Sequence, residues 1–295
     1  MRDRRHYRHG MALISVEELA ARIGRGDDDL VICDVRFDLS DHDRGRRDYN
    51  TAHIAGARFI DLHHELAVHD GSSPTGGGRH PLPTTQQFAE MLERNGVSPS
   101  SFVVAYDDAG GAVASRLWWM LRSIGHQRVA VLDGGYPAWV SADQHVEADT
   151  PAVNNSTYEV PPHWAGVVTA DEVVAAIDSG RTVIDSRAEA RYRGDTEPLD
   201  PRAGHVPGAL NLFHGGNLGE DGLHHPVADL RGRLNSVELG QQPIVYCGSG
   251  GTACHNLLVI SMLGIAEPGD ALLYPGSWSE WSRDEQRPVA TGDAP

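Results

Sequence analysis

Short hydrophobic blocks alternate along the chain with longer segments in which apolar residues recur every three or four positions. The blocks predict buried strands and the longer segments predict helices, because a covered strand is apolar throughout and a helix buries one face. In the first half we predict strands at 30–33, 102–106 and 129–132, and helices at 15–24, 85–95 and 112–124. In the second half we predict strands at 182–184, 244–246 and 271–273, and helices at 169–180 and 252–263. This alternation indicates an α/β fold with mainly parallel sheets.

The two halves repeat each other. Asp34 recurs as Asp185, the segment His53-Ile-Ala-Gly56 recurs as His205-Val-Pro-Gly208, and Tyr106 recurs as Tyr246. The spacing shortens before the third pair, which indicates an extra segment of about a dozen residues in the first half. We place it at 69–84, a loop rich in Gly, Pro and Ser, and also expect a charged loop at 38–49. The predicted domains are 11–141 and 164–290, joined by a polar linker at 142–163.

Composition limits the possible partners and the compartment. The chain has 295 residues and a formal net charge of −16, which argues against nucleic acid and anionic membranes as partners. Three cysteines form no disulfide framework, and no signal or membrane-spanning segment is present, so we expect a cytoplasmic protein. Residues 2–10 are interpreted as a leader, with Met11 a candidate start. The sixteen histidines follow no ligand pattern, so we expect no metal and no cofactor.

The segment with the clearest chemistry is Cys247-Gly248-Ser249-Gly250-Gly251-Thr252, which joins a predicted strand to a predicted helix. Glycines allow successive backbone N–H groups to turn inward, and the start of a helix adds further donors, so the loop is suited to bind an anion. A cysteine there ionises easily and is a candidate nucleophile, although a buried, inert cysteine is the alternative. Because Asp107 occupies the corresponding position in the first half, we predict that only the second half is catalytic.

On these residues the chain resembles the tandem-domain rhodanese-like sulfurtransferases, from about residue 12 to 285. The resemblance also includes the paired His-x-x-Gly-Ala segments, Trp118-Trp119, Gly134-Gly135 and Gly276-Ser-Trp278. It implies two rhodanese-like domains, each a mainly parallel sheet flanked by helices, and a persulfide on Cys247. It further implies a small-molecule sulfur donor, and cyanide or a thiol such as thioredoxin or a low-molecular-weight thiol as acceptor.

Within this family two donors compete. Loops of the thiosulfate branch typically carry basic residues after the cysteine, whereas Gly248 and Ser249 are uncharged and look like the 3-mercaptopyruvate branch. By position, the two arginines that bind the substrate carboxylate in that branch correspond to Arg191 and Arg202, with Arg187 and Arg193 as substitutes. A guanidinium matches a carboxylate geometrically. Gly248, Gly250, Gly251 and Thr252 complete the predicted substrate-binding set.

The resemblance also implies a Ser-His-Asp relay. Ser249 matches its serine and His80 matches its histidine, which the first domain would deliver into a shared cleft. The usual aspartate position holds His63, so Asp61 or Glu65 would have to replace it. Two further departures are Gly251, where valine is usual, and Pro275, where aspartate is usual.

Three other functions compete with that of a mercaptopyruvate enzyme: a thiosulfate sulfurtransferase, a non-catalytic binding module, and a Cys-x5-Arg phosphatase. The phosphatase is disfavoured because its arginine position holds Ala253. Cys33 and Cys254 are interpreted as core residues, with an oxidative pairing of Cys254 and Cys247 as a second possibility.

Overall fold

A computed structural model of the chain describes residues 12–153 and 156–295; the interpretation of residues 2–11 lies outside this part. The first half contains a sheet of five parallel strands in the order β1-β6-β5-β2-β4. The strands are β1 (Leu13–Ile14), β2 (Leu30–Asp34), β4 (Ala57–Phe59), β5 (Phe102–Tyr106) and β6 (Val129–Leu132).

The second half contains a sheet of four parallel strands in the order β11-β10-β8-β9. They are β8 (Val183–Asp185), β9 (Leu210–Asn211), β10 (Ile244–Tyr246) and β11 (Leu272–Leu273). Two sheets of parallel strands flanked by helices confirm the predicted fold class.

The helices of the first half are α1 (Val16–Arg25), α2 (Arg44–Thr51), α3 (Thr85–Arg94), α4 (Ala114–Ser123) and α5 (Gly135–Ser141). Those of the second half are α6 (Ala170–Asp178), α7 (Glu189–Arg193), α8 (Val227–Asn235), α9 (Ala253–Met262) and α10 (Ser277–Trp281), with a 3-10 turn at His214–Asn217. The Ser-x-x-Glu and Thr-x-x-Glu sequences at 15–18 and 169–172 form capping boxes at the starts of α1 and α6, where helices were predicted.

Two segments differ from the expected loops. The charged segment 38–49 contains most of α2, in which only Gly45 and Tyr49 are buried. The sequence there has almost no apolar periodicity from which a helix could be predicted. In the segment 142–163, β7 (Val146–Glu147) pairs antiparallel with β3 (His53–Ile54) of the first half. Residues 69–84 contain no helix or strand, as predicted.

The duplication is visible at the level of single hydrogen bonds. The carboxylate of Asp34 accepts from Arg36 and that of Asp185 from Arg187, in both pairs with a shortest distance of 2.6 Å from Nη2 to Oδ2. His53 and His205 each stack on a tyrosine and bond to its carbonyl, at 2.7 and 2.8 Å. Each half therefore preserves the same buried ionic and aromatic framework.

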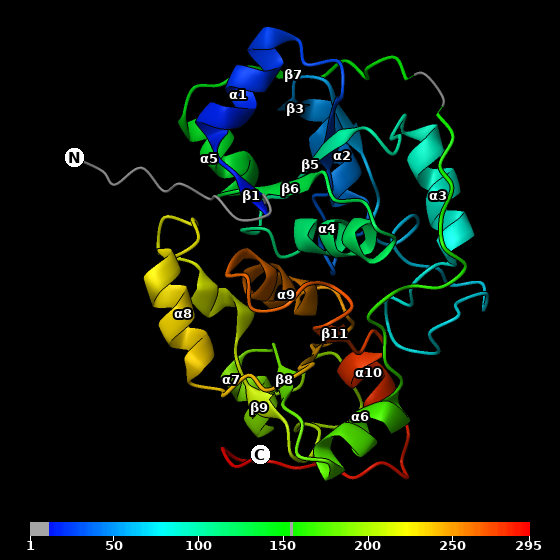
Figure 1. Ribbon diagram of the computed structural model, residues 1–295, viewed down its shortest axis with the longest axis vertical. Coiled ribbons are helices and arrows are strands. Elements are labelled where there is room, and N and C mark those ends of the chain that lie inside the picture. The colour runs from blue at the N-terminus through cyan, green and yellow to red at the C-terminus, as the bar shows by residue number, and fades with distance from the viewer. Residues whose placement is uncertain (1–11, 154–155) are drawn as a thin grey trace.

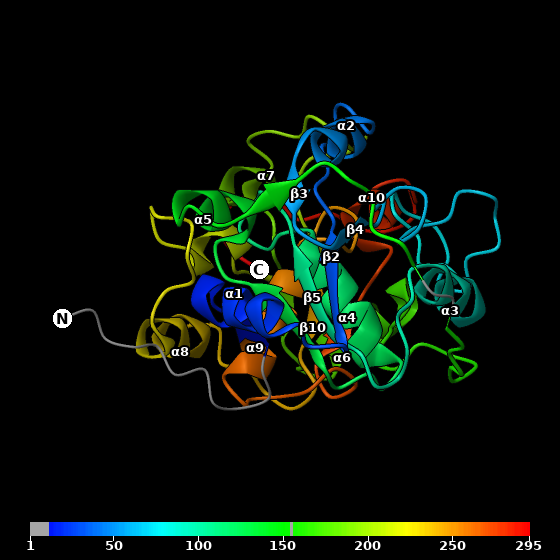
Figure 2. The ribbon, with the colours of Figure 1, turned by 90° about the horizontal axis from the view of Figure 1, so that it is seen from above.

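The halves meet along α4 and α9, which lie against each other between the two sheets (Figure 1). Each of these helices follows the loop after a central strand of its own half, so the loop after β10 is brought to the interface. Figure 2 shows the two helices from above, with the orange α9 beside the green α4. The 69–84 loop also crosses to the second half, where the backbone N–H of Arg79 donates to Ser279 Oγ at 2.8 Å.

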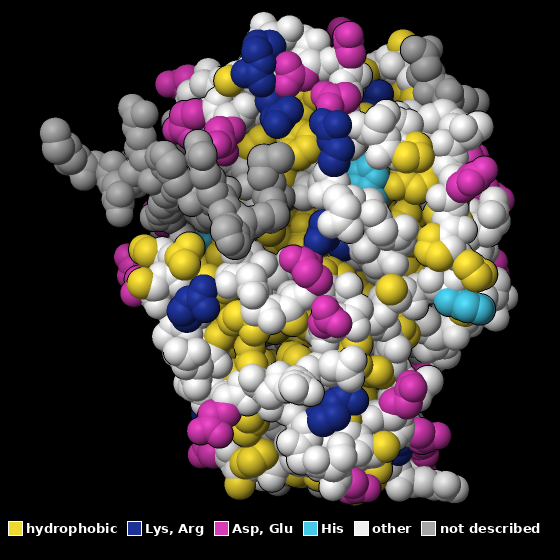
Figure 3. Space-filling model, in the orientation of Figure 1, with side chains coloured by type: hydrophobic (Ala, Val, Ile, Leu, Met, Phe, Trp, Pro, Cys, Tyr) yellow, Lys and Arg dark blue, Asp and Glu magenta, His cyan; other side chains and the backbone are white. Residues whose placement is uncertain are grey.

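Acidic and basic side chains are interspersed on the face drawn in Figure 3. Within the described residues, no helix has the length and apolar character needed to cross a bilayer.

Candidate active site

Cys247 lies at the carboxyl end of β10 and is almost fully buried, with 1% of its surface exposed. Its Sγ accepts a hydrogen bond from the N–H of Gly250 at 3.2 Å. Its own N–H donates to Ser277 Oγ at 3.2 Å, and its carbonyl accepts from the N–H of Trp278 at 3.0 Å. The start of α10 therefore fixes the backbone of the cysteine, while the glycine loop faces its sulfur.

The glycine loop is constrained at one position and open at another. Gly250 has φ of +77°, and a Cβ there would lie 2.7 Å from the carbonyl oxygen of Pro275, so only glycine fits. A Cβ at Gly251 would meet nothing within 4 Å, which agrees with the expectation that no side chain packs there.

The first half shows what this loop geometry binds. The carboxylate of Asp107, at the position equivalent to Cys247, accepts four backbone hydrogen bonds of 2.7–2.9 Å, from the N–H groups of Ala109, Gly111, Val113 and Ala114. The first domain thus holds a carboxylate of its own in this loop. The equivalent position in the second domain holds the sulfur of Cys247, which accepts from the N–H of Gly250.

A cavity of about 320 Å³ opens beside Cys247, with walls from both halves. The second half contributes Arg187, Ala188, Arg191, Leu199, Phe213, His214, Cys247, Gly248, Ser249, Gly251 and Thr252. The first half contributes Phe37, Leu39, Leu62, Arg79, His80, Ala112 and Val113. Three of the four predicted substrate-binding residues of the loop, Gly248, Gly251 and Thr252, therefore line the cavity. The fourth, Gly250, contacts the cysteine sulfur.

Ser249 and His80 meet across the domain boundary, with 2.8 Å between Oγ and Nδ1. Burial, together with the positive charges of Arg116 and Arg79, lowers the pKa of His80 to about 2. His80 is therefore neutral at ordinary pH, and the hydroxyl of Ser249 is held against an uncharged ring.

Neither proposed replacement for the relay aspartate reaches His80. The carboxylate of Asp61 accepts from the backbone N–H groups of His63 and His64, and Glu65 accepts from the N–H of Asp61. His63 itself lies edge-on to His80 with ring centroids 6.3 Å apart. Within the described residues Nε2 of His80 has no hydrogen-bond partner. The structure thus forms a Ser-His pair without a carboxylate.

Arg191 lies at the cavity, and an arginine that the sequence reasoning missed lies beside it. A Cβ placed on Gly248 would be 3.4 Å from Nη1 of Arg191 and 3.7 Å from Nη1 of Arg79. Nη2 of both arginines bonds Asp200, at 2.5 Å for Arg79 and 3.1 Å for Arg191, and Arg191 also bonds Glu197. The two guanidiniums are therefore held side by side, one from each domain, with their Nη1 groups directed at the cysteine loop.

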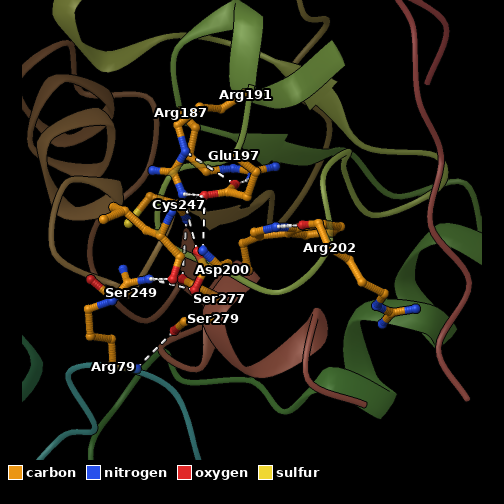
Figure 4. Close-up of polar contacts among 12 residues, drawn as sticks. Arg79, Arg187, Arg191, Glu197, Asp200, Arg202, Cys247, Ser249, Ser277 and Ser279 are labelled. Carbon is orange, nitrogen blue, oxygen red and sulfur yellow. Dashed lines mark hydrogen bonds and ion pairs between the residues drawn. The ribbon is translucent and has the colours of Figure 1, made fainter. Parts of the chain in front are cut away.

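Arg202 does not join them, which corrects the sequence assignment. Its guanidinium points away from Cys247 and bonds four backbone carbonyls after and at the end of α10, those of Trp281, Ser282, Asp284 and Arg287 (Figure 4). Of the proposed substitutes, Arg187 is committed to Asp185 and Glu197, and Arg193 bonds Asp195 outside the cavity. The second arginine beside Gly248 is Arg79 instead.

The sequence held a weak signal for Arg79, since it immediately precedes His80 in the loop expected to enter the cleft. Ser277 was also missed as a contact of Cys247; it has φ of +53° and its hydroxyl donates to the carbonyl of Tyr274 at 2.8 Å. Gly276-Ser-Trp278 entered the sequence analysis only as part of the family resemblance, which did not predict that Ser277 contacts Cys247.

The other two cysteines are buried thiols. Burial raises the pKa of the Cys33 thiol to about 12, and it also raises the pKa of Cys254, whose Sγ donates to the carbonyl of Gly250 at 3.4 Å. All three cysteines are free thiols. Among the described residues, no group of three or more His, Cys, Asp or Glu side chains is arranged to hold a metal ion.

Comparison with known proteins identifies the class that this fold and site define. The rhodanese-like domain model matches residues 15–142 and 169–284. A Pseudomonas aeruginosa protein named as a probable 3-mercaptopyruvate sulfurtransferase is 40% identical over 286 residues, which cover 95% of this chain and 98% of the relative. A Mycobacterium tuberculosis protein named as a thiosulfate sulfurtransferase is 39% identical over 292 residues, covering 97% and 99%.

The structures agree with the sequences. The 3-mercaptopyruvate sulfurtransferase from Leishmania major superposes with a TM-score of 0.82 at 28% identity, covering 96% of this chain and 77% of that one. The chain therefore belongs to the rhodanese family, as a tandem-domain member. It is a sulfurtransferase enzyme rather than a non-catalytic binding module.

Proposed function

We propose that this sulfurtransferase takes sulfur from 3-mercaptopyruvate, carries it as a persulfide on Cys247 and passes it to a thiol acceptor. The observation that carries the proposal is the pair Arg79 and Arg191 beside an uncharged loop. Within the described residues neither Nη1 makes a hydrogen bond, because Asp200 and Glu197 occupy the other nitrogens. Two free, adjacent donors suit the carboxylate of an α-keto acid.

The same pair explains the neutral residue at position 248. A basic side chain at Gly248 would start within 4 Å of both guanidiniums, where like charges repel. Arg79 and Arg191, which would bind a carboxylate away from the sulfur, therefore disfavour the basic residue that a thiosulfate enzyme is expected to carry after the cysteine. This favours a donor whose negative charge lies away from the atom under attack.

In the first half of the reaction, the thiolate of Cys247 attacks the thiol sulfur of the donor, and the sulfur–carbon bond breaks with its electron pair going to carbon. The enolate of pyruvate forms, and the proton lost from the donor sulfur is returned to that carbon. The hydroxyl of Ser249, held 2.8 Å from His80 Nδ1, is the group placed to pass this proton.

In the second half, an acceptor thiolate attacks the outer sulfur of the persulfide. The sulfur–sulfur bond breaks, the acceptor leaves as its own persulfide, and Cys247 returns as a thiolate. The N–H of Gly250, which already donates to Sγ, stabilises the negative sulfur in both states. A small thiol or the exposed cysteine of a thioredoxin-type protein suits a cavity of about 320 Å³.

Thiosulfate is the second candidate donor, because the free Nη1 groups could also bind its sulfonate-like oxygens and a relative at 39% identity bears that name. The experiment is intact-mass analysis of the full chain after treatment with each donor. We expect 3-mercaptopyruvate to add one sulfur atom to the wild type and none to Cys247→Ser. Sulfur on the folded variant, or loading by thiosulfate alone, would overturn the proposal.

A further inference from the structure

The buried arginine of α4 has no acidic partner. Arg116 is 0% exposed, and no carboxylate lies within 4 Å of its guanidinium in the described part of the chain. Nε and Nη2 donate to the carbonyl of Leu66 at 3.1 and 2.7 Å, and Nη2 also donates to the carbonyl of His80 at 2.9 Å. Nη1 is buried without a hydrogen-bond partner. A buried, uncompensated charge of this kind is costly and calls for a counter-ion.

The groups that this charge reaches across the domain interface are thiols. Arg116 interacts electrostatically with Cys254 and Cys247, the cysteines of α9 and of the loop that precedes it. Cys254 is a neutral thiol that donates to the Gly250 carbonyl, because burial raises its pKa. This leaves Cys247, whose sulfur is negative as a thiolate and again as a persulfide, as the anion that balances Arg116.

The other cations around Cys247 are already balanced. Arg79 pairs with Asp200, Arg187 with Asp185, and Arg191 with Glu197 and Asp200. The remaining titratable groups facing the cavity are His80, from the 69–84 loop, and His214, from the 3-10 turn, and burial lowers the pKa of both. Arg116 is therefore the one full positive charge near the sulfur, among the described residues, that no carboxylate neutralises.

We propose that Arg116 is the positioning residue through which the silent domain controls the catalytic cysteine. Its charge stabilises the anionic forms of Cys247, and its hydrogen bond to the His80 carbonyl holds that ring against Ser249. The proposal deepens the proposed function, but its first part depends only on the sulfur of Cys247 and not on the donor. The contact gives a domain without a nucleophile a part in the chemistry of Cys247.

The test measures the rate at which iodoacetamide alkylates Cys247 in the full chain as a function of pH, without any sulfur donor. We expect Arg116→Met to move the midpoint of this profile upward by about one pH unit or more, because a neighbouring positive charge favours the ionised form of a thiol. Arg116→Lys keeps the charge and should retain the wild-type midpoint while lowering kcat. Arg122→Met, on the same helix but paired with Glu267 outside the cavity, is the matched control.

A wild-type midpoint in folded Arg116→Met would overturn the proposal. A second measurement needs no arginine variant. Cys247→Ser removes the counter-ion, so its melting temperature should fall below that of the wild type, and the gap should widen as pH rises through the thiol titration. A gap that does not change with pH would contradict the proposed pairing. Neither the alkylation profile nor the melting temperature uses a sulfur donor. Both tests of Arg116 would therefore stand even if 3-mercaptopyruvate proved not to be the donor.

Discussion

The arginine pair at the cavity gives the sharpest prediction, because one member comes from each domain. Nη1 of Arg79 and Nη1 of Arg191 both point at Gly248, while Asp200 bonds Nη2 of each. We expect Arg79→Met and Arg191→Met each to raise KM for 3-mercaptopyruvate. Methionine keeps the apolar stem of the side chain and removes only the charged donors.

The magnitude follows from one lost hydrogen bond to a carboxylate. Such a bond contributes about 1.5–3 kcal/mol, which corresponds to a roughly 10- to 150-fold change in binding. Both side chains are just over four-fifths buried, so solvent screens the interaction only partly. Because Asp200 links the two arginines, the double variant should lose less than the sum of the single changes in free energy.

The assay is steady-state pyruvate formation over a range of 3-mercaptopyruvate concentrations. Arg193→Met, on the same short helix as Arg191 but paired with Asp195, should retain the wild-type KM. Melting curves establish that each variant is folded. A folded Arg79→Met enzyme with the KM of the wild type would refute the assignment of that arginine to the donor carboxylate.

Three further predictions test other parts of the site and fold. Ser249→Ala should lower kcat for 3-mercaptopyruvate by roughly 100-fold or more, and less for thiosulfate, because only the reaction of 3-mercaptopyruvate returns a proton to carbon. Equal losses of kcat with both donors in steady-state assays would show that the hydroxyl does not pass that proton. Arg202→Met should lower the free energy of unfolding by about 2 kcal/mol or more in a denaturant titration, because it removes the donor to four backbone carbonyls, while KM stays at its wild-type value. A large rise in KM would show that Arg202 binds the donor after all. Stability should also fall as pH drops below 6.5, by about 1.4 kcal/mol per pH unit for each histidine that stays neutral when folded, since the unfolded chain binds protons that the folded chain does not. A melting temperature unchanged between pH 7.5 and 5.5 would contradict this reading of the lowered pKa values of His80, His126, His214 and His255.

The parallel core and the duplicated architecture could be predicted because local signals were strong. The strands at 102–106, 129–132 and 244–246 were located to the residue, since fully buried strands are continuous apolar blocks. The capping boxes located the starts of α1 and α6. By contrast, α2 and α7 were missed because short, charged helices with few buried residues leave no periodic pattern.

The candidate site, too, could be predicted only in part. Cys247 and its glycines form one continuous segment, so the sequence could indicate a nucleophile and an anion-binding loop together. The second arginine was misplaced because position along the chain does not show where a guanidinium points. Arg202 turns to the carbonyls after α10, whereas Arg79 arrives from a loop far away in the sequence. Only the packing of the two domains brings Arg79 to Arg191.

The most direct test of the central claim is the ratio of kcat/KM for 3-mercaptopyruvate to kcat/KM for thiosulfate, measured on the wild-type enzyme with the same acceptor. The arrangement of a neutral loop beside two arginines with free donors predicts a ratio well above one. A ratio below one, with thiosulfate the better donor, would contradict the account and assign this site to thiosulfate instead.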